Sequence, residues 1–493
     1  MASAGDQDLG WAILLAIALV AAPLAARSAR YRARLRSWGE PAVAAAAVLG
    51  LFAMGIRRKP RRELKFGPSF EAPRCVGPSA RLGVSQADVL PGHSRWIAKG
   101  SGKPIELPFA RLSSGISVLG EKGSGKSRLL FALHDAIRAS HPRVPILIHD
   151  PKGEWHRTYY DAKTDLYFAP HFKGSAAWAL WRDFRAAPEL THELLTTTVY
   201  AHPDPSGSFW LDQAVELLEA AATFETFHLA ARYLARFARE HADDKFALSV
   251  FGTAKLGFLD LAKTELMGAA SERPAMGIDD FLRWPGRILL LNDPSCASQQ
   301  RGAFSLFLSA FLLRALSMPD VPAGTLRAVA ILDEALTFHL PPDVDRRIYT
   351  LCRSKGVCII AGAQRLPDAR NGERGEWQHS DYTFAMRVVD QATQRALSAR
   401  AGNLIFSETQ TSRSTGGAGG SRTESEQDAR LEAIPAEHFG RLSPRDFVLF
   451  HDGGLVSGRT LDVVRAQREL PRPPFDSRED VRAVSLQLLS GNS

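Results

Sequence analysis

The sequence predicts an α/β protein: a mostly parallel sheet, interrupted by an all-α insertion and preceded by an N-terminal helical hairpin. Short apolar runs end in acidic or glycine-containing turns, about 110 residues show helical spacing, and two long segments carry no charge. Strands that alternate with helices favour a parallel sheet, and 493 residues suffice for two or three domains. We expect five parts: an anchor (1–65), a first α/β part (66–170), an all-α insertion (171–282), a second α/β part (283–470) and a tail (471–493).

The N-terminal region contains two uncharged runs, residues 9–26 and 41–56. At 1.5 Å per residue they give helices of roughly 27 and 24 Å, near the ~30 Å hydrocarbon thickness of a bilayer. Trp11 and Trp38 lie near the edges of these runs, as interfacial aromatic residues do. A pair of buried Ala-rich helices is the alternative, but the flanking arginines favour two transmembrane helices.

The basic charge of the chain is concentrated beside these runs. The net charge is +8, and residues 27–65 alone carry +9, which leaves +1 for residues 66–493. Overall charge therefore gives no argument that the soluble part binds nucleic acid, and any such surface must be local. With two spans and both chain ends inside, the segment between the spans, with five arginines, lies outside, against the positive-inside preference. A single true span is the alternative.

Cysteine usage argues against a zinc site or a disulfide framework. The four cysteines form no C-x-x-C pair and do not cluster with histidines. This pattern fits a reducing compartment.

Residues 120–127 read G-E-K-G-S-G-K-S and match G-x-x-x-x-G-K-[ST] in full. An apolar run, 116–119, precedes them, and a segment with helical spacing, 127–138, follows. This is the strand–loop–helix context in which backbone N–H groups and a helix N-terminus bind a polyphosphate. An ordinary Gly-rich turn is the alternative. The expected ATP-binding residues are Gly120, Glu121, Lys122, Gly123, Ser124, Gly125, Lys126 and Ser127.

Two of these residues have specific expected roles. Lys126 is expected to reach the β- and γ-phosphates, and Ser127 to hold Mg²⁺. Further strands are expected at 144–149, 287–291, 328–332 and 356–361. The first ends in D-P-K-G-E (150–154), whose turn is expected to line the nucleotide crevice.

Polar residues at two strand ends complete the predicted site. Asp333, after strand 328–332, is placed to hold Mg²⁺ through water, and Glu334 to take a proton from the attacking water. A helix with an acidic first turn is the alternative for this pair. Gln364, after strand 356–361, is placed to orient water or sense the γ-phosphate, unless backbone groups satisfy it. Arg353 lies between these motifs, and a solvated surface charge is its alternative.

The remaining segments complete the expected outline. Residues 407–425 are rich in Ser, Thr and Gly and are expected to form a mobile loop. Residues 447–450 and 459–464 are expected to pair as a closing hairpin. The helices expected in the insertion cover 189–198, 210–225, 227–241 and 251–264, and another covers 301–316.

The order of motifs resembles the type IV coupling proteins of bacterial conjugation, the TraD/TraG/TrwB group. The resemblance runs from the predicted hairpin through residue 465. It rests on the glycine-rich loop, the D-P-K-G-E turn, F-A-P…W-A-L-W-R-D (168–183), F-W at 209–210, I-L-D-E-A (331–335) and C-R-S-K-G-V-C-I-I-A-G-A-Q (352–364).

The resemblance implies a RecA-like motor that forms a hexameric ring around a central channel. Such a motor binds single-stranded DNA with little sequence specificity and passes a relaxase-bound strand to a type IV secretion channel. It implies a multi-pass protein of the bacterial inner membrane, with its ATPase domain in the cytoplasm. The implied roles are phosphate binding for Lys126 and Ser127, Walker B for Asp333 and Glu334, and a sensor for Gln364. Arg353 falls where the family has an arginine finger that acts across a subunit boundary.

Two departures and two alternative functions remain. Residues 335–338, A-L-T-F, lack the aromatic that members often have closer to the acids, and the long acidic tail of some members is missing. The second departure leaves a tail-mediated relaxosome contact open. A secretion ATPase that delivers protein effectors is one alternative, since the soluble part is nearly neutral. A non-catalytic nucleotide-binding docking platform is the other, and the intact acid pair counts against it.

Overall fold

The structure is a computed structural model. It describes residues 62–71, 79–86, 102–169, 174–201, 209–270, 274–292, 297–338, 340–368, 375–414, 421–452, 454–461 and 469. Both expected transmembrane helices lie outside the described residues, as do the rest of residues 1–61 and the predicted tail. No helix within the described ranges is long and apolar enough to cross a membrane.

The chain divides into two compact units. One comprises residues 1–65 and 405–429, and the other comprises 66–404 and 430–493. The second unit contains a sheet of eleven strands, whose spatial order mixes early and late segments of the chain. In that order they are β3 (Pro104–Pro108), β2 (Ser79–Gln86), β14 (Gly454–Thr460), β13 (Asp446–His451), β10 (Tyr382–Ala385), β4 (Ile116–Leu119), β9 (Val357–Ala363), β8 (Ala328–Leu332), β5 (Ile146–Asp150), β7 (Arg287–Leu291) and β6 (Leu166–Phe168).

The part of this sheet from β10 to β6 is parallel. The strands from β10 back to β3 are antiparallel. Strands buried on both faces are expected to be continuously apolar, and β4, β5, β8 and β9 are buried at every position. The mostly parallel α/β fold expected from the sequence is thus confirmed.

Helices cover this sheet and extend from it. Those in the first half are α4 (Lys126–Ser140), α5 (Glu154–Tyr159), α6 (Leu180–Ala186), α7 (Pro188–Tyr200), α8 (Phe209–Ala222), α9 (Phe227–Glu240) and α10 (Lys245–Ala270). Those in the second half are α11 (Ile278–Leu282), α12 (Ala297–Ser317), α13 (Pro342–Lys355), α14 (Gln391–Ala401) and α15 (Ala436–Arg441). Short 3-10 turns lie at η1 (Phe109–Ser114), η2 (Ala335–Thr337) and η4 (Glu376–His379).

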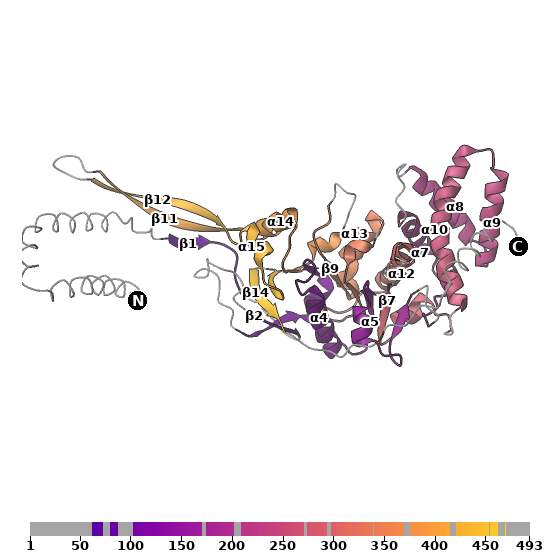
Figure 1. The fold of residues 1–493 in the computed structure, drawn as a ribbon, viewed down its shortest axis with the longest axis horizontal. Coiled ribbons are helices and arrows are strands. Elements are labelled where there is room, and N and C mark those ends of the chain that lie inside the picture. The colour runs from indigo at the N-terminus through magenta and orange to yellow at the C-terminus, as the bar shows by residue number, and fades with distance from the viewer. Residues whose placement is uncertain are drawn as a thin grey trace, which may run out of the picture. The chain divides into compact units, whose positions relative to one another are not determined.

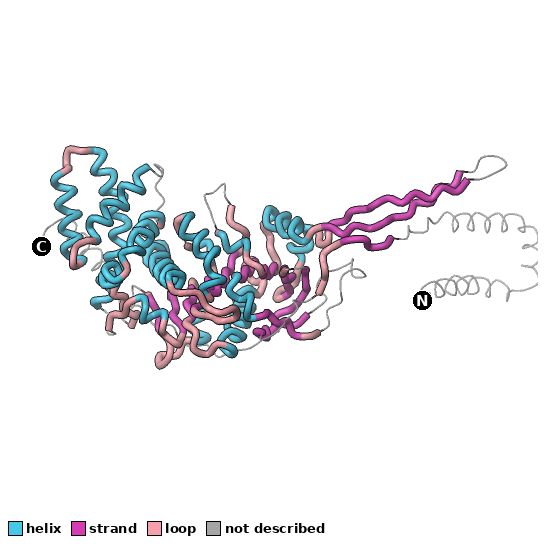
Figure 2. The backbone as a smooth tube through the Cα atoms, turned by 180° about the vertical axis from the view of Figure 1, so that it is seen from behind, coloured by secondary structure: helices cyan, strands magenta, loops and turns pink. Residues whose placement is uncertain are grey.

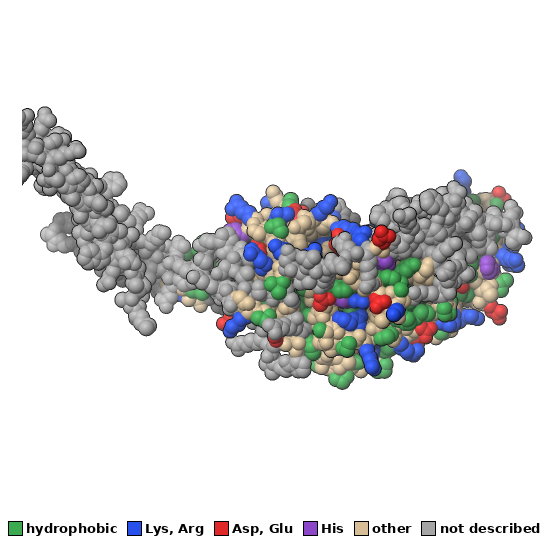
Figure 3. All heavy atoms as spheres, turned by 60° about the horizontal axis from the view of Figure 1, so that its bottom comes forward, with side chains coloured by type: hydrophobic (Ala, Val, Ile, Leu, Met, Phe, Trp, Pro, Cys, Tyr) green, Lys and Arg blue, Asp and Glu red, His purple; other side chains and the backbone are tan. Residues whose placement is uncertain are grey.

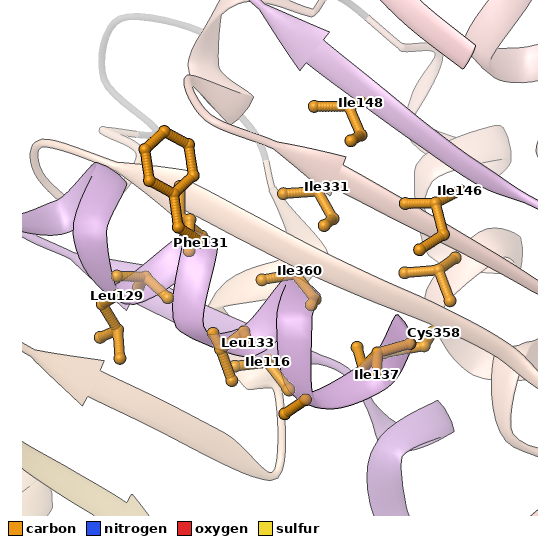
Figure 4. Packing of buried hydrophobic residues seen from close by; sticks show 14 of the residues in the cluster. Ile116, Leu129, Phe131, Leu133, Ile137, Ile146, Ile148, Ile331, Cys358 and Ile360 are labelled. Carbon is orange, nitrogen blue, oxygen red and sulfur yellow. The ribbon is translucent and has the colours of Figure 1, made fainter. Parts of the chain in front are cut away.

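The core lies between α4 and the parallel strands. Ile116 of β4 and Ile360 of β9 are fully buried, and Leu133 and Ile137 of α4 are 1% exposed. Figure 4 shows these α4 side chains packed against the strands, with Ile331 and Ile148 continuing the layer. Burial of each such side chain contributes about 1.5–3 kcal/mol. This packing fixes the start of α4, and therefore the glycine-rich loop, over the carboxyl ends of the strands.

The insertion is helical, as expected. Helices α8, α9 and α10 stand together at the end of this unit away from β2 and β14 (Figures 1 and 2). Thr226 caps α9 by accepting a hydrogen bond from Leu229 N at 3.3 Å, and Phe227 stacks on Phe258 with ring centroids 4.9 Å apart. The predicted helices at 189–198, 210–225 and 227–241 are confirmed, whereas the one at 251–264 is part of the longer α10.

The prediction of a mobile loop at 407–425 is wrong. In the other unit, β11 (Asn403–Ser414) and β12 (Ser421–Glu432) pair with each other, and β1 (Arg62–Phe66) joins beside β11. Within 407–425, residues 415–420 lie outside the described chain. Backbone hydrogen bonds between neighbouring strands stabilise such a polar hairpin. These bonds do not require apolar side chains, so the pattern of apolar residues did not predict the strands.

Two short strands escaped the sequence analysis. Strands β6 and β10 are three and four residues long and lie between segments without a clear pattern. The closing hairpin is confirmed, but its second strand, β14, begins at Gly454 and pairs with His451 directly across the turn. The surface carries charges of both signs, interspersed over the face in Figure 3, in keeping with its small net charge.

We predict opposite effects for two helical glycines. A Cβ added to Gly302 of α12 would overlap Oδ2 of Asp260, a fully buried carboxylate that also binds Lys263 at 2.7 Å. Gly302→Ala should therefore destabilise the protein by about 1–3 kcal/mol. The matched control is Gly252→Ala in α10, where a Cβ meets nothing within 4 Å and should stabilise by up to ~1 kcal/mol. Thermal unfolding should give a lower Tm for the first and an equal or higher Tm for the second, and equal shifts would contradict this packing.

Candidate functional site

The glycine-rich loop joins β4 to α4 in a conformation that needs glycine at two positions. Gly123 and Gly125 have φ angles of 80° and 101°, in the left-handed region that L side chains rarely adopt. A Cβ on Gly125 would also lie 3.1 Å from Cα of Arg445. The entrance of the loop is fixed by Gly120 N, which donates to the carbonyl of Ala363 at 2.9 Å. The backbone is therefore tightly held at both ends of the loop.

Lys126 is the residue on which the site converges. Its side chain is 10% exposed, and Nζ donates to the backbone carbonyl of Asp333 at 2.6 Å. Nζ also lies 3.4 Å from Glu334 Oε2 and 3.6 Å from Asp333 Oδ1. The same Oε2 accepts a hydrogen bond from Gln364 Nε2 at 3.1 Å. The structure thus brings four residues expected from the sequence together at one point.

The strand register explains this convergence. Leu119 of β4 lies beside Ala363 of β9, and Ala361 of β9 lies beside Leu332 of β8. The loop and the residues after β8 and β9 therefore leave the sheet at the same edge. Gly362 allows the close approach, because a Cβ there would lie 3.1 Å from the carbonyl oxygen of Asp333.

The carboxyl group of Asp333 is largely removed from water. It is 5% exposed, and Trp155 Nε1 lies 3.4 Å from Oδ2, a long hydrogen bond. Burial raises the pKa of Asp333, and the Lys126 ammonium opposes that shift. Trp155 directly follows the D-P-K-G-E turn that was expected at this crevice, but no motif in the sequence assigns it a role.

A second buried acid, Asp150, lies at the end of the neighbouring strand. His149 of β5 pairs in register with Leu332 of β8, so the next residues, Asp150 and Asp333, stand side by side. Asp150 is fully buried, and its Oδ2 accepts a hydrogen bond from His156 N at 2.7 Å. Burial raises the pKa of Asp150 to about 7. His149 is buried with it, and burial lowers the pKa of its imidazole to about 3.

The arrangement suits a magnesium nucleotide. Ser127 lies half-buried in the first turn of α4, and Asp333 offers its carboxylate at the facing strand end. Hydroxyl and carboxylate oxygens are the hard ligands that Mg²⁺ prefers. The glycine-rich backbone at the start of α4 offers N–H groups to an anion. These residues therefore fit the ion and the triphosphate that the sequence predicts.

The loop has further contacts that the sequence analysis missed. Glu121 forms an ion pair with Arg387, the second residue after β10, and Glu121 N donates to the carbonyl of Arg387 at 2.9 Å. On the other side, Arg445 N donates to the carbonyl of Ser124 at 2.6 Å. Arg445 itself has a positive φ of 74°, which is uncommon for a residue with a side chain. Arg387 follows a strand that had not been expected, so no sequence signal pointed to it.

Arg353 lies away from this cluster. It is exposed on the last turn of α13, four residues before β9 begins, and its carbonyl accepts a hydrogen bond from Ser113 Oγ at 3.4 Å. Gln364 follows the other end of β9, so the two residues lie at opposite edges of the sheet. Within one subunit Arg353 is therefore remote from Lys126, and its action on a neighbouring subunit stays a prediction.

The raised pKa of Asp150 gives a pH-dependent stability. The unfolded chain ionises Asp150 near pH 4, whereas the folded chain keeps its proton up to about pH 7. Folding stability should therefore fall as pH rises through this window, because the unfolded state then binds fewer protons. Asp150→Asn removes the effect and leaves an oxygen to accept the bond from His156 N.

We expect the Tm of Asp150→Asn, relative to wild type, to increase between about pH 4 and pH 7 and to level off above. The same substitution at the exposed Asp343 controls for the amide as such. A Tm difference that stays constant across this window would show that Asp150 is not held protonated.

Two family models match the sequence. Residues 102–230 match the type IV secretion-system coupling protein DNA-binding domain, and residues 327–444 match the TraM recognition site of TraD and TraG. The first match contains the glycine-rich loop and the D-P-K-G-E turn, and the second contains Asp333, Glu334, Arg353 and Gln364. No curated protein sequence matches this chain significantly.

Solved structures of a conjugative coupling protein, TrwB, share the fold. The unbound form is 14% identical, covers 81% of this chain and 97% of its own, and has a TM-score of 0.60. A complex with a non-hydrolysable ATP analogue is 14% identical, covers 84% and 98%, and has a TM-score of 0.61. A complex with ADP and Mg²⁺ is 15% identical, covers 81% and 98%, and has a TM-score of 0.59. These structures share the α/β fold of this chain, and the two family matches show that the chain belongs to the type IV coupling proteins.

Proposed function

We propose that this protein is a membrane-anchored, ATP-driven DNA translocase that couples a relaxase-bound single strand to a type IV secretion channel during bacterial conjugation. The observation that carries this proposal is the convergence on Lys126. Its ammonium contacts Asp333 and Glu334, and Gln364 donates a hydrogen bond to the Glu334 carboxylate. A loop that binds phosphate and acids that act on water meet there, as ATP hydrolysis requires.

The residues divide the work of hydrolysis. Lys126, whose ammonium contacts Asp333 and Glu334, is placed to reach the β- and γ-phosphates and to neutralise their charge. Glu334 accepts a proton from the water that attacks the γ-phosphate in line, and Gln364 holds the Glu334 carboxylate in position. Ser127 and Asp333 would hold Mg²⁺, which supplies charge neutralisation between the phosphates.

DNA contact is proposed for the region 102–230, which matches a DNA-binding domain model. The charge of residues 66–493 is only +1, so DNA contacts depend on local groups rather than on a strongly basic surface. Contacts to the DNA phosphates are ionic, so the affinity for DNA should fall as the salt concentration rises. They do not read the bases, so the affinity should depend little on the DNA sequence. The region 327–444, which matches a TraM recognition site, supports a relaxosome partner.

The assembly and location of the motor also belong to this proposal. A RecA-like motor of this kind works as a homo-hexamer, with Arg353 of one subunit reaching the nucleotide of the next. The uncharged segments 9–26 and 41–56 anchor it in the bacterial inner membrane, with the ATPase domain in the cytoplasm.

Two substitutions test the hydrolytic site. Lys126→Ala should abolish nucleotide binding and turnover, and Glu334→Gln should retain binding but lose about 10²–10⁴-fold in ATP turnover. The matched control is Glu437→Gln, an exposed carboxylate on α15, which should turn over ATP as wild type does. Steady-state ATPase rates of the purified full chain, with and without single-stranded DNA across a salt range, measure this. Full turnover by Glu334→Gln would reject its role, and absence of DNA stimulation would favour protein cargo.

A mixing experiment tests Arg353. If it acts across a subunit boundary, Arg353→Ala and Lys126→Ala should each be inactive alone, but mixed rings should regain part of the activity. Regained activity arises where an intact loop faces an intact Arg353 of the neighbour. ATPase activity measured against mixing ratio should pass through a maximum. Activity that stays at the level of the separate variants would contradict action across a subunit boundary, and wild-type activity of Arg353→Ala alone would place Arg353 outside the reaction.

A further inference from the structure

The glycine-rich loop contains an acid, Glu121, at its second position. A carboxylate beside a bound triphosphate repels it, because like charges disfavour one another even where water screens them. In the structure this charge is paired, because Glu121 Oε1 accepts a hydrogen bond from Arg387 Nε. The Glu121 side chain is 23% exposed and the Arg387 side chain is 31% exposed. The cation comes from a segment 266 residues further along the chain.

Backbone hydrogen bonds also connect the glycine-rich loop to the segment that contains Arg387. Ala385 of β10 lies beside Leu119 of β4, Met386 N donates to the carbonyl of Leu119 at 2.8 Å, and Glu121 N donates to the carbonyl of Arg387 at 2.9 Å. The ladder between β4 and β10 thus continues into the phosphate-binding loop. Arg387 is held from its own side as well, since Val388 N donates to the carbonyl of Phe439 at 3.0 Å.

The position of Arg387 is therefore set by the sheet and not by the loop. Its backbone belongs to the end of β10, which pairs with β13 on the side away from β4. The loop backbone is already anchored at Gly120, Glu121 and Ser124 by bonds to neighbouring strand ends and to Arg445. The side-chain pair adds little to this anchoring, and its main effect is electrostatic.

We propose that Arg387 is a positioning residue for nucleotide binding, which cancels the charge of Glu121 and presents its own cationic group beside the phosphate-binding loop. The inference rests on the proposed nucleotide-binding function of this loop. An ion pair of this kind can have two roles. If the pair only holds the loop in place, removing either side chain should weaken nucleotide binding. If Arg387 compensates the charge of Glu121, removing Arg387 should weaken binding and removing Glu121 should not.

The experiment is a double-mutant cycle on the full chain, with the dissociation constant of ADP in the presence of Mg²⁺ as the main readout. Arg387→Gln leaves Glu121 unpaired and should weaken ADP binding roughly fivefold to tenfold. Glu121→Gln leaves Arg387 free for phosphate and should bind ADP at least as tightly as wild type. The double variant should return to within about twofold of wild type, and Arg387→Lys should retain most of the affinity.

The KM for ATP should follow the same order, with kcat changed by less than about twofold, because the pair acts on binding and not on the water that attacks. The matched control is Asp343→Asn with Arg346→Gln, an exposed ion pair within α13, which should leave ADP binding unchanged. Equal weakening by both single substitutions at 121 and 387, or no change by either, would overturn the inference while leaving the proposed function intact. Failure of the wild type to bind ADP would overturn both.

Discussion

The parallel register of β4, β9, β8 and β5 is the constraint on which the site depends. Each strand ends within two residues of its neighbour, so the residues that follow all leave the sheet at one edge. Parallel strands connected by crossovers place their carboxyl ends together, and this edge is where open α/β sheets bind ligands. The core between α4 and the strands preserves this alignment, because a slip of one residue would turn apolar side chains away from the helix.

Electrostatics inside this edge explains why the residues contact one another. Asp150 and Asp333 are both buried, and burial favours their neutral forms. The ammonium of Lys126 is the cation that the acids at 333 and 334 share. A magnesium nucleotide bound as proposed would bring both positive and negative charge to these same groups.

The glycine-rich loop is held by segments from distant parts of the sequence. Bonds from the ends of β9 and β10 and from Arg445 fix its backbone, and the left-handed glycines leave room for that approach. A loop fixed in this way loses little conformational entropy when it binds a ligand. The loop is ordered when the sheet folds, so the packing that stabilises the core also preorganises the site.

The sequence by itself determined the local features: the glycine-rich loop, the acids at 333 and 334, Gln364, and most of the helices of the insertion. These depend on patterns within a few residues, since helix and strand periodicity and turn chemistry are local. Only the tertiary structure decided which distant residues meet. Trp155 beside Asp333, Asp150 in register with it, Arg387 on Glu121, and the polar hairpin of β11 and β12 all depend on strand order. Strand order and register arise from packing between segments hundreds of residues apart, and no local pattern encodes that distance.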